Sequence, residues 1–208
     1  MRKSARFGGA MSQWFDMWSV EDPKEKEEIQ LAGLRESIED ILSIIRNETS
    51  SVPASRIILG GISQGSATAI MAMLHGQVRL GGFIGLCTWL PFQGWVADYA
   101  RNFGRSYTLK NIHSILKMQP CETTVSADQL ISDRKSAFDT PTFLSHSKDD
   151  EVVPIENGRL FKRTLEYLNV ATTWKEYEDG RHWVNEPQGV DDIVQFIKEK
   201  VGMASYIV

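Results

Sequence analysis

The chain has little cysteine, and this argues against two kinds of small protein. Only Cys87 and Cys121 occur among its 208 residues, and neither has the spacing to histidine or to a second cysteine that metal sites require. A secreted domain stabilised by several disulfide bonds is therefore not expected, and neither is a metal centre. We expect both thiols to stay reduced in a cytoplasmic protein; a disulfide between them is the alternative.

Long apolar runs and an excess of positive charge are also missing. No stretch approaches the roughly 20 apolar residues of a membrane-spanning helix. Early basic residues such as Arg2 and Arg6 are followed by acidic residues and not by the apolar region of a signal peptide. The formal net charge is −4. These features argue against targeting, stable membrane insertion and nucleic-acid binding.

Repeats, low-complexity tracts and linkers are missing as well. With 42% hydrophobic and 24% charged residues, the chain can bury one core, and we expect a single domain over residues 1–208. Patterns typical of strands and helices alternate, which favours a mostly parallel sheet with helices on both faces. Strands are expected over 57–59, 82–87, 142–146 and 172–177, and helices over 22–47, 66–74, 96–103, 109–117, 156–168 and 190–201.

Three parts of this pattern carry more detailed predictions. Asp22 as N-cap, followed by Pro23 and by Glu25 in a capping box, marks the start of the first helix. The stretch 95–136 is more polar and less regular, and it is expected to form a cap or insertion over the sheet edge. The stripes expected to face the core are Leu34, Ile38, Ile41 and Ile45 in the first helix, and Val190, Ile193, Val194, Ile197 and Val201 in the last.

The strongest motif is the sequence Gly61-Ile62-Ser63-Gln64-Gly65. It joins an apolar strand to a helix-forming stretch, and this context turns a weak five-residue pattern into a nucleophile elbow. The serine hydroxyl is exposed on a sharp turn, and the start of the following helix offers free N–H groups to a developing oxyanion. We therefore expect Ser63 to be a nucleophile and the Gln64 N–H to be one oxyanion-hole donor.

An acid and a base follow the serine in the order that such elbows use. Asp150 comes after the strand expected to end at His146, and His182 comes after the strand expected to end at Tyr177. A histidine can take the serine proton and return it to the leaving group, while the acid fixes its tautomer. Asp150 has an alternative role as a helix cap, although Asp149 is the more favoured capping residue.

The remaining histidines have ordinary explanations. His75 and His113 fall inside helical patterns, where we expect them at the surface or partly packed, and His146 is expected to make structural hydrogen bonds at its strand end. None of the three is spaced to a carboxylate or cysteine as metal ligands are. No cofactor is required by serine, histidine and aspartate alone.

Five segments in family order resemble the acyl-protein thioesterase and phospholipase/carboxylesterase family in its fungal form. The matching segments are residues 12–16, 56–65, 89–91, 146–154 and 177–182. The resemblance implies an α/β-hydrolase fold, with Ser63 as nucleophile, Asp150 as acid and His182 as base. It also brings Trp14, Trp89 and Trp183 near these residues, where they are expected either to wall an acyl pocket or to pack in the core.

The resemblance also shows a departure at the start of the chain. Family members have further strands before this point, and one carries a His-Gly-x-Gly loop that completes the oxyanion hole; no such sequence occurs here. A truncated gene model, a partner chain or a rebuilt N-terminus would each account for this. We expect strand 57–59 to be covered by residues 1–10 or, preferably, by a second copy in a homodimer. Gly8-Gly9 is expected to form a turn, with approach to the site as the alternative.

The function predicted from these residues is hydrolysis of carboxylic esters or acyl thioesters through an acyl-enzyme, without a cofactor. The substrate is expected to be a small molecule, a lipid or an acylated protein. One alternative is acyl release in a biosynthetic pathway, for which the region 95–136 would shape the pocket. The other is a non-catalytic binding or assembly protein that has kept the three residues.

Overall fold

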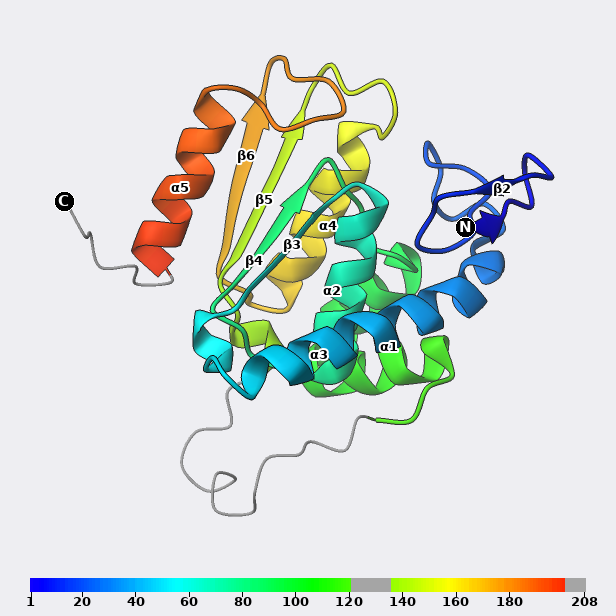
Figure 1. Ribbon diagram of the computed structural model, residues 1–208, viewed down its shortest axis with the longest axis horizontal. Helices are drawn as coiled ribbons and strands as arrows, with labels where there is room; N and C mark the ends of the chain where they lie inside the picture. Colours follow the sequence, from blue (N-terminus) through cyan, green and yellow to red (C-terminus); the bar gives the residue numbers. More distant parts are fainter. Residues whose placement is uncertain (121–135, 201–208) are drawn as a thin grey trace.

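A computed structural model describes residues 1–120 and 136–200, and its centre is a four-stranded parallel sheet (Figure 1). The strand order is β3-β4-β5-β6, so each strand pairs with the next one along the chain. Gly60 stands opposite Ile84, and Ile84 stands opposite Phe143. The strands are β3 (Ile58–Ile62), β4 (Gly82–Leu86), β5 (Thr142–Ser147) and β6 (Thr172–Tyr177). The predicted parallel sheet is confirmed.

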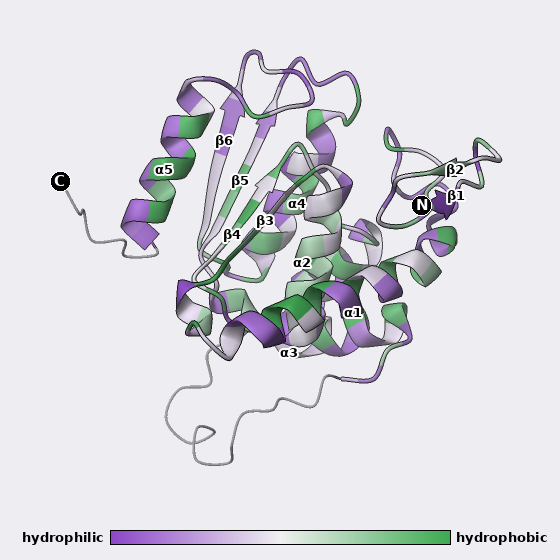
Figure 2. Cartoon of the chain, viewed as in Figure 1, coloured by the Kyte–Doolittle hydropathy of each residue, from purple (hydrophilic) through white to green (hydrophobic). Residues whose placement is uncertain are grey.

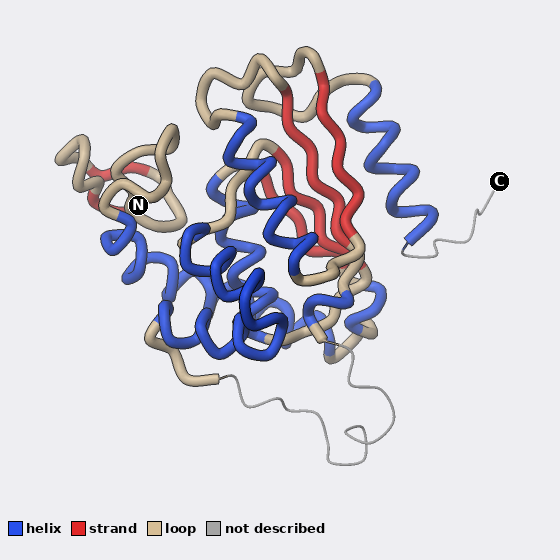
Figure 3. The backbone as a smooth tube through the Cα atoms, turned by 180° about the vertical axis from the view of Figure 1, so that it is seen from behind, coloured by secondary structure: helices blue, strands red, loops and turns tan. Residues whose placement is uncertain are grey.

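Helices cover both faces of this sheet, as predicted, but very unequally. On one face lie α1 (Gln30–Thr49), α2 (Gln64–Gly76), α3 (Gln93–Leu116) and α4 (Ile155–Tyr167). Within this layer α1 packs on α2 and α3 packs on α4. The other face is covered by α5 (Gln188–Lys200), which stands apart from the rest in Figures 1 and 3. The fold is the predicted α/β hydrolase arrangement.

The inward stripe predicted for the last helix is partly wrong. Figure 2 shows that α5 carries both hydrophobic and hydrophilic residues along its length, but Val190 and Val194 are each 42% exposed. The buried contact is made by Phe196, whose ring centroid lies 5.5 Å from that of Phe143 on β5. The main contacts of α5 are with strands β4, β5 and β6, and a narrow apolar stripe is enough to make them. Val201 lies outside the described residues.

The first helix begins later than its capping signals predict. Instead of starting at Asp22, α1 starts at Gln30 after a short 3-10 turn, η1 (Glu27–Ile29). Lys26 adopts a left-handed conformation with φ 51°, which an α-helix cannot accommodate. Its ammonium lies 3.0 Å from the ring centroid of Trp18, and this cation–π contact favours the turn. The predicted inward stripe is confirmed, since all four residues are buried.

The region predicted to be a cap contributes a long helix to the main helical layer. α3 contains both short helices expected there and is interrupted at Gly104, where φ is 71° and ψ is −169°. It packs against α2 and α4. Residues 121–135 and Cys121 lie outside the described residues, so the cap over 95–136 stays a prediction. Among the helices that the structure describes, none combines the length and apolar character needed to cross a membrane.

The first residues form a hairpin of their own beside the N-terminal end of α1 (Figure 1). β1 (Arg2–Lys3) pairs antiparallel with β2 (Ala10–Met11), and Gly8 makes the turn with φ 71°. Gly8-Gly9 is therefore a turn, as predicted. Within residues 1–120 and 136–200, no strand pairs with the outer edge of β3. The prediction that residues 1–10 cover this edge is wrong, because the hairpin pairs with itself and Arg2 bonds to Glu36 on α1.

Candidate active site

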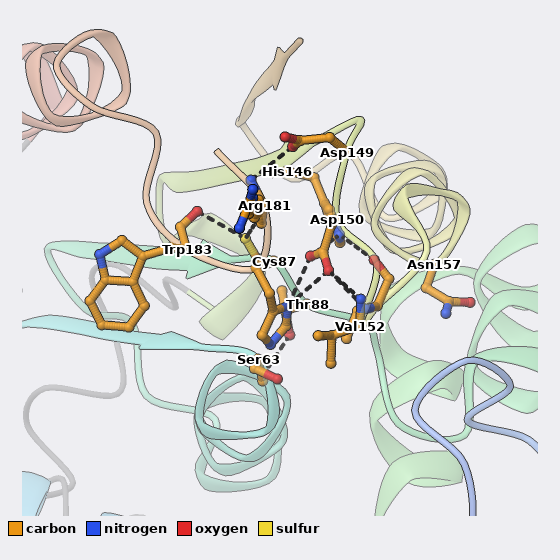
Figure 4. Close-up of polar contacts among 12 residues, drawn as sticks. Ser63, Cys87, Thr88, His146, Asp149, Asp150, Val152, Asn157, Arg181 and Trp183 are labelled. Atoms are coloured by element: carbon orange, nitrogen blue, oxygen red, sulfur yellow. Dashed lines mark hydrogen bonds and ion pairs between the residues drawn. The ribbon is translucent and has the colours of Figure 1, made fainter. Parts of the chain in front are cut away.

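Ser63 occupies a strained turn between β3 and α2. Its φ of 54° and ψ of −129° are unfavourable for a residue with a side chain, and its N–H donates to the carbonyl of Leu86 at 2.8 Å. Gly61 permits the turn, because a Cβ there would lie 2.5 Å from the backbone nitrogen of Ser66. Thr88 Oγ1 donates to the Ser63 carbonyl at 3.0 Å (Figure 4). The predicted strand–turn–helix elbow is confirmed.

Gln64 does more than open α2. As first residue of the helix, its N–H belongs to the free donors beside Ser63. Its side chain also holds the N-terminal segment: Oε1 accepts the Trp14 N–H at 2.7 Å, and Nε2 donates to the Phe15 carbonyl at 2.9 Å. The sequence predicts the backbone role alone. The side chain fixes residues 14–15 against the elbow.

Asp150 and His182 meet in the structure, although 32 residues separate them. His182 Nδ1 lies 2.8 Å from Asp150 Oδ2, and Asp150 Oδ1 accepts the N–H groups of Val152 and Val153 at 2.9 Å each (Figure 4). The Asp150 side chain is fully buried, while that of His182 is partly exposed. The helix-cap role considered for Asp150 is wrong, because α4 begins after Pro154 without a side-chain cap, and Asp150 Oδ1 instead accepts two N–H groups of the turn before the helix.

His146 makes the structural contacts predicted for it, but the sequence did not identify the Asp150 carboxylate as one of its partners. Its Nε2 lies 3.1 Å from Asp150 Oδ2 and 2.9 Å from the Val153 carbonyl. Burial lowers the pKa of His146, so its ring is neutral and Nε2–H is a donor. Gly158 leaves room for the ring, since a Cβ there would lie 2.6 Å from Nδ1. The one sequence signal was the strand end four residues before Asp150.

Cys87 lies beside the same pair at the end of β4. Its thiol donates to the Trp183 carbonyl at 3.3 Å, and its sulfur lies within 4.8 Å of ligand atoms of Asp150 and His182. Burial raises the pKa of Cys87 to about 12. The thiol thus stays protonated and bonds to the backbone of the loop that carries His182, while Asp150 bonds to the His182 ring. The absence of a metal site stays a prediction.

Ser63 and the Asp150–His182 pair lie at the same carboxyl end of the parallel strands. Ser63, Cys87 and Asp150 follow β3, β4 and β5, and Figure 4 shows their side chains converging there. In the described part of the chain, the Ser63 hydroxyl makes no hydrogen bond to His182. Such contacts often tighten only when substrate binds.

The three tryptophans differ in what they offer a ligand. Trp14 is 45% exposed, and its indole nitrogen lies 3.3 Å from where a Cβ on Gly65 would stand. Trp183 is 60% exposed and follows His182 directly. Trp89 is 1% exposed and belongs to the hydrophobic core, which agrees with the packing alternative that the sequence left open.

A groove of about 730 Å³ runs beside Ser63. It is lined by residues 62–65 of the elbow, by residues 12–14, and by Glu36 and Asp40 of α1. The groove therefore lies between the elbow, the N-terminal segment and α1, and neither Asp150 nor His182 lines it. It gives a ligand access to Ser63 from the side of residues 12–14 and α1.

Asp149, His75 and His113 differ from their predicted roles. Asp149 does not cap a helix: its Oδ1 accepts the N–H of Arg181 at 2.8 Å. His75 and His113 are buried and form an edge-to-face pair with ring centroids 4.8 Å apart. The surface prediction is wrong because α2 is covered on all sides by α1, α3 and the sheet. Burial lowers the pKa of His75 to about 4.

Comparisons with known proteins agree with this geometry. The phospholipase/carboxylesterase family model matches residues 2–133. Acyl-protein thioesterase 1 of Yarrowia lipolytica is 26% identical over 203 residues, covering 95% of this chain and 73% of the relative. That of Cryptococcus neoformans is 27% identical over 178 residues, covering 85% and 60%.

Solved structures show the same fold. SOBER1 of Arabidopsis thaliana has a TM-score of 0.67 at 21% identity, covering 96% of this chain and 79% of that one. Acyl-protein thioesterase 2 of Zea mays has a TM-score of 0.62 at 23% identity, covering 97% and 78%. With a matching family model over more than half of its length and this fold, the chain belongs to the phospholipase/carboxylesterase family of α/β hydrolases.

Proposed function

We propose that the protein is a serine hydrolase that uses Ser63, His182 and Asp150 as a catalytic triad. The observation that carries this proposal is the 2.8 Å contact between His182 Nδ1 and a fully buried Asp150 carboxylate, at the carboxyl end of the strands where the elbow presents Ser63. A buried carboxylate holds the imidazole in the tautomer that leaves Nε2 free to accept a proton. Family membership supports the same reaction class.

The reaction proceeds through an acyl-enzyme. Ser63 Oγ attacks the carbonyl carbon while His182 takes the hydroxyl proton, and the Gln64 N–H donates to the oxyanion. Collapse of this intermediate breaks the bond to the leaving group, which receives the proton from His182. Water then attacks the acyl-serine with His182 again as base and releases the carboxylic acid. Each step uses only groups of the protein, its substrate and water.

The proposed substrate is an acyl thioester, with carboxylic esters accepted as well. The support comes from the names of the relatives, which are acyl-protein thioesterases. Trp14 and Trp183 are exposed near Ser63 and His182, and we propose that their rings contact the acyl chain. A cytoplasmic location is proposed from the free Cys87 thiol, which fits a reducing compartment.

The open edge of β3 is the one observation that favours the alternative of a non-catalytic binding protein. A fluorophosphonate probe separates the two, since only an activated serine reacts with it. We expect the native protein to be labelled and the Ser63→Ala variant to stay unlabelled. An unlabelled native protein with native circular dichroism would reject the hydrolase. Labelling that persists in Ser63→Ala would reject Ser63 as the nucleophile.

We also propose that a second copy of the chain covers the edge of β3. The strand is self-complementary in an antiparallel register centred on Gly60, in which Ile58 of one copy stands opposite Ile62 of the other. Light scattering after size exclusion tests this proposal. We expect a dimer for the native chain and a monomer for Ile58→Lys, whereas Ile44→Lys on the exposed side of α1 leaves the dimer intact. A native monomer would reject it.

A further inference from the structure

The loop that presents His182 has an unfavourable backbone. We define residues 180–183 as the histidine loop. Gly180 has φ 130° and Arg181 has φ 53°, so two consecutive residues before His182 lie in the left-handed half of conformational space. A non-glycine residue rarely stays there unless its surroundings impose the conformation. Contacts from outside the loop must therefore hold it in place.

Asp149 supplies one of these contacts. Its Oδ1 accepts the Arg181 N–H at 2.8 Å, and this bond joins the segment after β5 to the histidine loop after β6. A hydrogen bond to an ionised carboxylate is stronger than one between neutral groups. It acts on the Gly180–Arg181 peptide unit, at the N–H of the residue with the unfavourable φ. The N-terminal side of His182 is therefore fixed by Asp149.

Cys87 supplies a contact on the other side. Its thiol donates to the Trp183 carbonyl at 3.3 Å, and its sulfur lies 3.9 Å from the Arg181 carbonyl. The residue is 1% exposed and follows β4. Because burial keeps the thiol neutral, it remains a hydrogen-bond donor and is no competing nucleophile. The backbone on both sides of His182 is thus held from two different strands.

We infer that Asp149 and Cys87 are positioning residues of the proposed hydrolase, which hold the histidine loop so that the imidazole stays against Asp150 and within reach of Ser63. This inference rests on the proposed function. Neither residue needs to touch the substrate. They act on the backbone, whereas Asp150 acts on the imidazole itself. A small displacement of a catalytic group lowers the rate strongly, by up to about 100-fold for 1 Å.

Asp149 variants provide the sharpest test, because asparagine keeps the accepting oxygen. We expect Asp149→Ala to lower kcat about 10- to 100-fold with an unchanged KM. We expect Asp149→Asn to stay within about threefold of the native value, since its amide oxygen still accepts the Arg181 N–H. Glu151→Ala, which removes an exposed carboxylate two residues away, is the matched control and should not change kcat.

Cys87 is tested in the same way. Cys87→Ser keeps a donor and Cys87→Ala removes it, so we expect kcat to fall more in the alanine variant. Equal kcat values in the two variants would reject the donor role of the thiol. Thermal unfolding of each variant identifies loss of fold, and the conservative variant keeps the test valid if alanine destabilises the protein.

Hydrogen exchange makes the test independent of activity. The Arg181 amide should exchange slowly in the native protein and in Asp149→Asn, and faster in Asp149→Ala. If Ser63→Ala is inactive while Asp149→Ala keeps native kcat and slow exchange, the positioning role is wrong and the hydrolase stands. If the native protein neither hydrolyses esters nor reacts with fluorophosphonate, the hydrolase and the positioning role are both rejected. Exchange of the Arg181 amide then shows only whether its hydrogen bond to Asp149 exists.

Discussion

The two halves of the proposed site are built differently. The acid–base half lies where β4, β5 and β6 end. His182 Nδ1 lies 2.8 Å from Asp150 Oδ2 there, and Asp149 Oδ1 accepts the Arg181 backbone N–H at 2.8 Å. The nucleophile half lies at the sheet edge, where Gly60 is exposed and a groove of about 730 Å³ opens beside Ser63. One half is enclosed by its own chain, and the other faces space that a ligand or a second chain can enter.

This difference shows where the fold needs rigidity. The imidazole must return to the same position in both steps of the reaction, and the hydrogen bonds to its ring and to the loop on both sides of it provide that. The serine already has its position from the backbone of the elbow, so fewer side-chain contacts are needed around it. The groove beside Ser63, lined by residues 12–14 and α1, then remains for the substrate.

The largest loss of kcat should come from two single variants, one in each half of the site. Ser63→Ala and His182→Ala should each lower kcat to the same residual rate, by about 10⁶-fold on the precedent of serine proteases. The double variant should lose no more than either single one, because the two residues act as a unit. Steady-state hydrolysis of a short-chain p-nitrophenyl ester measures this. Additive losses would show that the two halves work independently.

Asp150→Asn should follow, with kcat lowered about 10⁴-fold, because an amide leaves the imidazole in the wrong tautomer. Asp149→Asn is the matched control, and its kcat should change only slightly. The same ester assay ranks the two variants. The reverse ranking would transfer the acid to Asp149 and contradict the contact between Asp150 and His182.

Gly61→Ala should disturb the nucleophile half alone. The added Cβ would lie 2.5 Å from the Ser66 nitrogen, and the resulting shift of the elbow should destabilise the fold by about 1–3 kcal/mol. We expect kcat to fall in parallel. Urea unfolding and the ester assay measure the two effects. Gly94→Ala, at a position with nothing within 4 Å, is the control and should be neutral.

The smallest effect is expected at Gln64. Gln64→Ala keeps the backbone N–H but removes both bonds to residues 14–15, which loosens Trp14 beside the groove. We expect KM to rise up to about tenfold with little change in kcat, given the ordinary strength of a neutral hydrogen bond. A series of p-nitrophenyl esters of increasing acyl length measures it. A fall in kcat at constant KM would mean that the side chain also supports the oxyanion hole.

Sequence predicts those parts of this molecule that follow from local patterns. The strand over 172–177 agrees residue for residue with β6, and the strand before Asp150 differs by one residue. The elbow was recognisable because its glycines, serine and flanking patterns are contiguous. These features depend on few residues from elsewhere in the chain.

The remaining features depend on contacts between distant residues. Lys26 contacts the distant Trp18 ring and has a left-handed conformation. No α-helix therefore starts at the capping sequence around Asp22, and α1 begins only at Gln30. No sequence pattern links His146 to Asp150, and none links Cys87 to the residues around His182. Each acquires its role only when three strand ends come together, and a single sequence does not encode that geometry in a local pattern.

The buried thiol of Cys87 is a built-in probe of local opening in the protein. An alkylating reagent reaches a thiol that is 1% exposed only after the surrounding segment has moved away. In a Cys121→Ser background, the alkylation rate at low reagent concentration therefore reports how often the edge beneath His182 opens. The thiol that holds the histidine loop can then be used to measure how often this loop opens, without a spectroscopic label.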